Sequence, residues 1–327
     1  MKRRPFVKYL GMTAVGASVS PFQFSFASPT YPLRPVKIIV PLAPGGGSDA
    51  IGRLLAANLS EKFGQSFIVE NRPAASGIVG TDAVAKAQPD GYTLLTVFST
   101  HAMSAELFKK LPYDPIKDFV PVSLAIQSPL VLLINPSLPI NNFKEFVAYA
   151  KANPNKLNYG SSGQGSAPHL MTEQLNVMAG IKTTHVPYKG VAPITLALVQ
   201  NEIQFALANI FTTLPMVKAG RIKMIATGGT KRSLLAPDIP TIAESGLKGY
   251  DSVVWYGILA PAKTPPEIVE ELSNEIAIIL RKPEIVKIIT EGGNEPVGST
   301  PQQMAAVMSE DAKKWGDLGR KLGVELE

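Results

Sequence analysis

Short apolar runs alternate with amphipathic segments along most of the chain. Val36–Val40 (VKIIV) is β-branched and of strand length, and a glycine-rich turn follows it. From there to Phe63, apolar residues recur at helical spacing, which predicts an amphipathic helix. The alternation continues with a strand at 67–70, a helix at 78–87 and a strand at 92–97. Strands and helices that alternate at these lengths predict parallel α/β layering.

Two stretches mark where the chain passes between lobes. Apolar runs at 120–126 and 130–134 are separated by Gln127-Ser128-Pro129, a break that argues against one continuous strand. We therefore predict a domain crossover there and a return crossing at Ser252–Pro261. Two crossings predict a hinge between two lobes that close on a ligand. The expected division is an export signal at residues 1–27, a first lobe of residues 31–127 plus 251–327, and a second lobe of residues 128–250.

The remaining predicted elements fill both lobes. Two long amphipathic helices, Pro266–Leu280 and Pro301–Leu322, finish the chain and are expected to pack on the first lobe. The second lobe is expected to contain strands at 157–160, 204–208 and 224–227 and helices at 142–152, 166–175, 193–199 and 214–219.

A glycine- and serine-rich loop follows a strand and opens a helix at two places, Pro44–Asp49 and Ser161–Ser166. Glycine lets the backbone come close to a ligand, and the free N–H groups of a helix start attract anions. In parallel α/β sheets, ligands sit at the carboxyl ends of strands, where Ser99–His101 also lies. The two loops are more than a hundred residues apart and fall in different predicted lobes. They predict the two halves of a site for a small carboxylate.

Composition and charge exclude several classes of function. The chain has 327 residues and no cysteine, so a disulfide, a thiol nucleophile and a cysteine-ligated metal are impossible. Residues 1–30 carry four of the 32 basic residues and no acid, which leaves the remainder with a formal net charge of +2. Without a basic patch interleaved with aromatic residues, nucleic acid is not an expected partner.

The first 27 residues have the features of an export signal. A basic start is followed by a weakly apolar run, and Ser25-Phe26-Ala27 offers small residues for cleavage. The segment Arg3–Lys8 (RRPFVK) resembles the twin-arginine export motif, and a Sec-type signal is the alternative. No later segment holds the ~20 uninterrupted apolar residues that a membrane span needs. We expect an exported protein that is soluble after signal removal.

The residues of the two loops match other kinds of chemistry less well. The first loop meets neither the P-loop nor the dinucleotide pattern, and a tight turn without a ligand remains the alternative. Ser161 and Ser162 suggest a serine hydrolase, but the nucleophile elbow G-x-S-x-G is not met. The three histidines, His101, His169 and His185, show no paired metal-ligand spacing. Asp49 is expected to cap the helix that it begins.

Many spaced motifs in order make the chain resemble one family over essentially its whole mature length. They include Val40–Asp49 (VPLAPGGGSD), Val69–Pro73 (VENRP) and Pro89–Leu95 (PDGYTLL). They continue with LPYDP at 111–115, YGSSG at 159–163, HVPYKG at 185–190, PDIPT at 237–241 and EPVGSTP at 295–301. The chain resembles the solute receptors of tripartite tricarboxylate transporters, the Bug or TctC-type family.

The resemblance implies a two-lobed α/β periplasmic-binding-protein fold, of the Venus-flytrap, type II-like kind, with two crossover strands. It implies a small carboxylate held by main-chain N–H groups and hydroxyls, without catalysis, cofactor or metal, and delivery to integral-membrane permease subunits. A receptor that docks on a sensor kinase and, less favoured, a serine hydrolase are the alternatives. The ligand-binding residues implied are Pro44, Gly45, Gly46, Gly47, Ser48, Ser99 and His101 in the first lobe, and Ser161, Ser162, Gly165, Ser166, Tyr188, Gly190 and Asn209 in the second.

One position departs from the family pattern. Where relatives commonly carry an Asp-Asn pair after the strand at Phe205, this chain has Ala208-Asn209. If that aspartate receives an ammonium or hydroxyl group of the ligand, its absence argues against amino-acid ligands and favours a plain carboxylate. This hypothesis predicts that Ala208→Asp changes the ligand profile.

Overall fold

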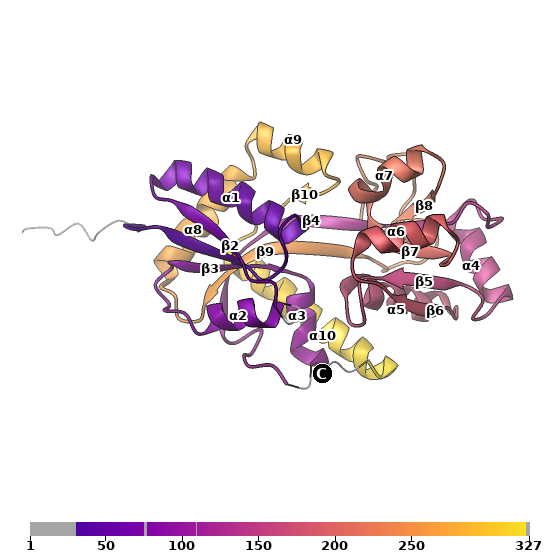
Figure 1. Cartoon of the computed structure of the whole chain (residues 1–327), viewed down its shortest axis with the longest axis horizontal. Helices are drawn as coiled ribbons and strands as arrows, with labels where there is room; N and C mark the ends of the chain where they lie inside the picture. The colour runs from indigo at the N-terminus through magenta and orange to yellow at the C-terminus, as the bar shows by residue number, and fades with distance from the viewer. Residues whose placement is uncertain (1–30, 75–76, 109, 325–327) are drawn as a thin grey trace, which may run out of the picture.

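The computed structural model describes residues 31–74, 77–108 and 110–324. The predicted export signal at 1–27 lies outside the described residues. The chain folds into two α/β lobes joined by long strands, as Figure 1 shows. In the described part of the chain, no helix combines the length and apolar character needed to cross a membrane.

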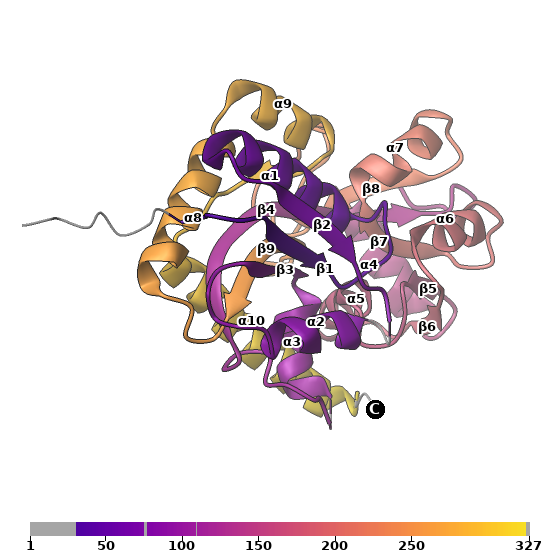
Figure 2. The same cartoon turned by 60° about the vertical axis from the view of Figure 1, so that its left-hand side comes forward.

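The first lobe contains three parallel strands, each followed by a helix. Apolar residues alternate between the two faces of this sheet, so that Ile38 packs on one face and Ile39 on the other. Helices α1, α8 (Pro266–Ile279) and α9 (Pro283–Glu291) cover the face of Ile38, and α2, α3 and α10 (Pro301–Leu322) cover the other, as the turned view in Figure 2 shows. The strands are β1 (Val36–Val40), β2 (Phe67–Asn71) and β3 (Thr93–Phe98), and the helices are α1 (Gly47–Phe63), α2 (Ile78–Ala85) and α3 (Thr100–Leu107).

Two adjacent antiparallel strands, β4 (Phe119–Ile134) and β9 (Val253–Pro261), run between the lobes. The prediction that the segment 127–129 interrupts the first of these strands is wrong, because β4 is continuous. Up to Pro129, β4 pairs with β9, and from Leu130 it pairs with β7 (Phe205–Asn209). The polar break in the sequence therefore marks a change of pairing partner within one strand.

The second lobe repeats the parallel design. Its central strand β5 pairs in parallel with β6 and β7, and β7 and β8 both pair with the far half of β4. Phe146, Tyr159 and Phe205 form the aromatic centre of its core. Its strands are β5 (Asn158–Ser161), β6 (Thr184–Pro187), β7 (Phe205–Asn209) and β8 (Lys223–Thr227), and its helices are α4 (Phe143–Ala152), α5 (Ala167–Ala179), α6 (Val191–Val199) and α7 (Ile210–Lys218).

The C-terminal part returns to the first lobe as α8 (Pro266–Ile279), α9 (Pro283–Glu291), β10 (Glu295–Pro296) and α10 (Pro301–Leu322). Neither α3 nor α9 is among the predicted elements. Helix α8 packs in the first lobe as expected. Helix α10 packs on α3 and also inserts Trp315 into the cluster that forms the second lobe's core. The last helix therefore contacts both lobes.

Candidate functional site

The pairing pattern makes the carboxyl ends of the strands in one lobe point toward those of the other. β4 runs from the first lobe to the second, and its antiparallel partners β7 and β9 run back. β3 is antiparallel to β9, and β1 is parallel to β3, so both end facing the second lobe. β5 is parallel to β7, so both end facing the first. The helices that follow these strands, α1, α3, α5 and α7, therefore begin in the region between the lobes.

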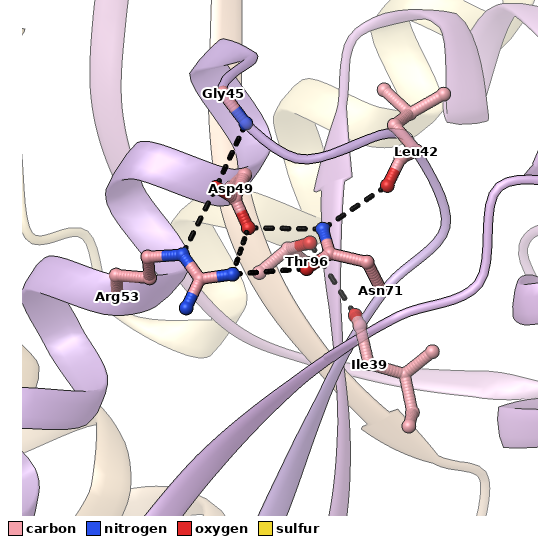
Figure 3. A network of polar contacts seen from close by, with 7 residues as sticks. All are labelled: Ile39, Leu42, Gly45, Asp49, Arg53, Asn71 and Thr96. Atoms are coloured by element: carbon pink, nitrogen blue, oxygen red, sulfur yellow. Dashed lines mark hydrogen bonds and ion pairs between the residues drawn. The ribbon is translucent and has the colours of Figure 1, made fainter.

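The first glycine loop is held by a network around Asp49, shown in Figure 3. The buried Asp49 carboxylate accepts hydrogen bonds from the Gly45 N–H (2.9 Å), Arg53 Nε (3.0 Å) and Asn71 Nδ2 (2.9 Å). The hydrogen bond from Arg53 is the largest of the causes that lower the pKa of Asp49 to about 2. The prediction that Asp49 caps the helix is corrected, because Gly46 occupies the cap and Asp49 reaches back from the first turn to Gly45.

The same network ties both ends of the loop to the neighbouring strand β2. Asn71, the last residue of β2, donates to the Leu42 carbonyl (3.1 Å) and accepts from Arg53 (3.0 Å). On β3, the Thr96 hydroxyl donates a hydrogen bond to the Ile39 carbonyl of β1 over 3.4 Å. Arg53 forms an ion pair with Asp49, so the carboxylate beneath the loop does not stand as an uncompensated charge.

The tip of this loop keeps polar groups available. Among the described residues, the N–H groups of Gly46, Gly47 and Ser48 donate no hydrogen bond. The Ser48 hydroxyl is buried and also lacks a partner among them. A Cβ on Gly47 would lie 2.6 Å from the Tyr256 hydroxyl, so the close approach of β9 requires glycine here. Pro44 precedes this tip.

In the Ser99–His101 segment, the side chains of Ser99 and His101 make hydrogen bonds within the protein, whereas that of Thr100 makes none among the described residues. The Ser99 hydroxyl accepts the Trp255 N–H (2.8 Å) and thereby joins β3 to β9. His101 Nε2 lies 2.8 Å from the Pro115 carbonyl, within an aromatic cluster of the first lobe, and burial lowers its pKa to about 4. The hydroxyl between them, on Thr100, is buried without a partner among the described residues. Thr100 lies within the predicted Ser99–His101 segment, but it was not among the individual ligand-binding residues named from the sequence.

In the second loop, the structure joins residues that lie far apart in the sequence. Ser161 Oγ lies 2.6 Å from His185 Nε2, a contact between β5 and β6. The Gly165 N–H donates to His169 Nδ1 (3.1 Å), and the Ser166 hydroxyl donates to the Gly163 carbonyl (2.7 Å). Ser162 is exposed at the tip. His185 was not predicted as a site residue, and only its place in the HVPYKG motif at 185–190 could have suggested it.

The other predicted residues of the second lobe lie at two helix starts. Gly190 caps α6 with a φ of 105°, and the Tyr188 N–H bonds to the Ser161 carbonyl (2.9 Å). Asn209 caps α7 by accepting the Phe211 N–H (2.9 Å). The Asn209 side-chain amide also donates to the Ser128 hydroxyl and, over 3.5 Å, to Asn294 between α9 and β10. The side chain of Asn209 is therefore held both by the crossing strand β4 and by the segment between α9 and β10.

Ala208 is buried on β7 opposite Val131 and packs in the core cluster beneath α6. A carboxylate at this position would enter an apolar environment at the start of α7. The effect of Ala208 on the ligand class stays a prediction.

The distance between Ser161 Oγ and His185 Nε2 is within the range expected for a nucleophile and its general base. Ser161 is, however, completely buried, and its hydroxyl also lies 3.0 Å from the Gly163 carbonyl, which it can donate to. Among the described contacts, no carboxylate orients the other nitrogen of His185. The described residues also contain no cluster of three or more His, Asp or Glu side chains that could hold a metal. Binding through N–H groups and hydroxyls fits this arrangement better than covalent catalysis.

Two α/β lobes, joined by crossing strands and with helix starts facing each other, define a periplasmic binding protein. The model of the TctC family, the "Tripartite tricarboxylate transporter family receptor", matches residues 51–324, and the chain belongs to this family. It is 34% identical to Protein BugT of Bordetella pertussis over 91% of this chain and 92% of that protein. It is 36% identical to a UPF0065 protein of Agrobacterium vitis over 90% of this chain and 84% of that protein.

Solved structures agree with this assignment. An R. palustris protein solved with adipate, Rpa4515, has a TM-score of 0.79 and 36% identity, and the match covers 90% of this chain and 99% of that one. MatC from Rhodopseudomonas palustris, solved with bound malate, has a TM-score of 0.75 and 32% identity, over 88% of this chain and 99% of that one. The two-lobed receptor fold predicted from the sequence is confirmed.

Proposed function

We propose that this protein is an extracytoplasmic receptor that binds a small carboxylate between its lobes and delivers it to a tripartite tricarboxylate-type membrane transporter. The observation that carries the proposal is the convergence of α1, α3, α5 and α7 at their N-terminal ends. Free N–H groups and the partial positive charge of helix starts favour an anion. The proposed ligand-binding residues are those predicted from the sequence, in the two glycine loops and at Ser99, His101, Tyr188, Gly190 and Asn209, with the Thr100 hydroxyl added.

The affinity expected from such a site is compatible with a receptor. A helix N-terminus favours an anion by ~0.3–1 kcal/mol when exposed and by more where water is excluded. Hydrogen bonds to a charged group contribute about 1.5–3 kcal/mol each. A few contacts of both kinds reach the ~8 kcal/mol of micromolar binding. Related proteins solved with adipate and malate support dicarboxylates as the first ligands to test.

The unpartnered Ser48 hydroxyl allows a direct test. A thermal-shift screen of residues 28–327 against di- and tricarboxylates, acidic amino acids and aromatic acids identifies the ligand. At 100 times its dissociation constant, that ligand should stabilise the protein by ~2.7 kcal/mol. Ser48→Ala should then weaken binding about tenfold or more without destabilising the fold, because no hydrogen bond among the described residues is lost. The exposed Ser309→Ala serves as the matched control. The absence of a shift with every carboxylate would refute the proposal.

Delivery and export need separate measurements. Capture of the ligand-loaded receptor by permease subunits supports transport, whereas capture by a sensor kinase supports the signalling alternative. Mass spectrometry of the mature N-terminus tests cleavage after Ala27.

A hydrolase would convert ester or amide substrates and would lose turnover in Ser161→Ala. Recovery of the bound ligand unchanged, with Ser161→Ala altering affinity only, supports the receptor.

A further inference from the structure

Two stacked imidazoles lie beneath the second glycine loop and hold it from different elements. His169 is on α5 and His185 on β6, and their ring centroids are 4.0 Å apart. Each ring makes one hydrogen bond to the loop: His169 Nδ1 with the Gly165 N–H (3.1 Å) and His185 Nε2 with Ser161 Oγ (2.6 Å). The loop is therefore anchored at its first residue and near its last by side chains that lie outside it.

The donor and acceptor roles define the protonation states. A backbone N–H can only donate, so His169 Nδ1 must be unprotonated and the ring neutral, with its proton on Nε2. Ser161 Oγ accepts the Gly163 N–H (3.2 Å) and can donate to the Gly163 carbonyl (3.0 Å). With that hydroxyl proton used, His185 Nε2 donates to Ser161. Both bonds to the loop are then satisfied at the same time.

The surroundings of the pair favour its neutral form. The Tyr159 ring stacks on both imidazoles, at centroid distances of 6.4 Å and 5.0 Å. The Tyr159 hydroxyl donates to Glu173 (2.6 Å), which engages that carboxylate away from the rings. Burial, together with the nearby His185, lowers the pKa of His169 to about 4, and burial lowers the pKa of His185 as well. Tyr159, Glu173 and the two histidines are the titratable groups at this contact.

We propose that His169 and His185 are positioning residues that hold the 161–166 loop in its carboxylate-binding shape, and that neutral His169 is required for binding. The inference rests on the proposed function. A proton on His169 Nδ1 would face the Gly165 N–H and remove the hydrogen bond that holds this glycine to α5. The loop then loses its anchor beside the start of that helix, and acidification releases the ligand.

The experiment compares His169→Leu, which has no acceptor, with His169→Asn, whose amide oxygen can stand where Nδ1 stood. Adipate binding is measured by calorimetry between pH 7.5 and pH 4. At pH 7.5 we expect His169→Leu to bind about five- to tenfold more weakly, and His169→Asn to bind within about twofold of the wild type. His185→Gln should likewise keep binding better than His185→Leu. Thr172→Val, which removes a buried hydroxyl contact within α5, controls for general weakening of that helix.

The pH profile separates positioning from packing. Protonation of adipate lowers affinity equally in the wild type and in His169→Asn, so the ratio of their affinities isolates the histidine. As the pH falls below 5, the affinity of His169→Asn for adipate should increase relative to that of the wild type. Equal profiles, or full binding by His169→Leu, would overturn the inference.

A measurement without ligand distinguishes this inference from the proposed function. Hydrogen exchange of the Gly165 amide should be faster in His169→Leu than in the wild type and Thr172→Val. Unchanged exchange overturns the positioning role even if adipate binds. If exchange responds but the wild type binds no carboxylate of the screen, the proposed function fails and the ligand-binding part of this inference fails with it.

Discussion

Replacing Asp49 with asparagine tests how strongly the network in Figure 3 stabilises the first glycine loop. The carboxylate accepts hydrogen bonds from Gly45, Arg53 and Asn71. Asparagine has nearly the same shape but only one acceptor oxygen, and its NH₂ group would face one of these donors. The variant therefore leaves at least one donor unpaired and removes the ion pair.

The magnitude follows from the pKa of Asp49, which the network lowers from 3.8 to about 2. A shift of this size corresponds to about 2 kcal/mol of stability. Solvent screens part of the Arg53 contribution, because that side chain is 54% exposed. We expect Asp49→Asn to lower the free energy of unfolding by about 1–2 kcal/mol at pH 7.

The pH dependence has a definite sign. Because the pKa is lower in the folded state, the stabilisation is present above the unfolded-state value of about 4 and is lost as the pH falls toward 2. The difference between the wild type and Asp49→Asn should therefore be nearly constant from pH 7 to pH 5. By pH 3 it should fall to about half.

Urea unfolding monitored by circular dichroism measures this difference at each pH. Asp317→Asn is the matched control, since Asp317 forms an exposed ion pair with Arg320 and should change stability by less than about 0.5 kcal/mol. An Asp49→Asn effect no larger than that of the control, or one that does not diminish between pH 5 and pH 3, would refute the reasoning.

Three further substitutions test contacts elsewhere. Gly47→Ala should lower the melting temperature in a thermal melt, because the added Cβ would lie 2.6 Å from the Tyr256 hydroxyl and 2.7 Å from the ring carbon Cζ of the same side chain. Thr300→Ala should lower the free energy of unfolding by about 1 kcal/mol in a urea titration, since it removes the capping box of α10. Both tryptophans of the chain donate their indole N–H to Asp311, so Asp311→Asn should shift the intrinsic fluorescence and lower stability by about 1 kcal/mol; unchanged emission would contradict this expectation.

Local patterns in the sequence determine the elements and the class of the protein. The β-branched run Val36–Val40 is predicted and observed with the same bounds, because its composition and the following turn are sufficient to define a strand. The two glycine loops, each between a strand and a helix, likewise depend on neighbours in the sequence. The spaced motifs, which the family match supports, indicate a TctC-type receptor.

Contacts between distant residues are decided only by the tertiary structure. Asp49 meets Asn71, and Ser161 meets His185, only because parallel pairing of β1 with β2 and of β5 with β6 brings their ends together. Aspartate, asparagine, serine and histidine side chains have many possible hydrogen-bond partners in a sequence of this length. The register of the paired strands defines which of these partners comes within hydrogen-bond distance. The continuity of β4 has the same cause, since its partners β9 and β7 are more than seventy residues away. The local segments and the receptor family can therefore be inferred from neighbouring residues alone, whereas the packing of distant strands defines which polar groups are engaged and which remain available for a ligand.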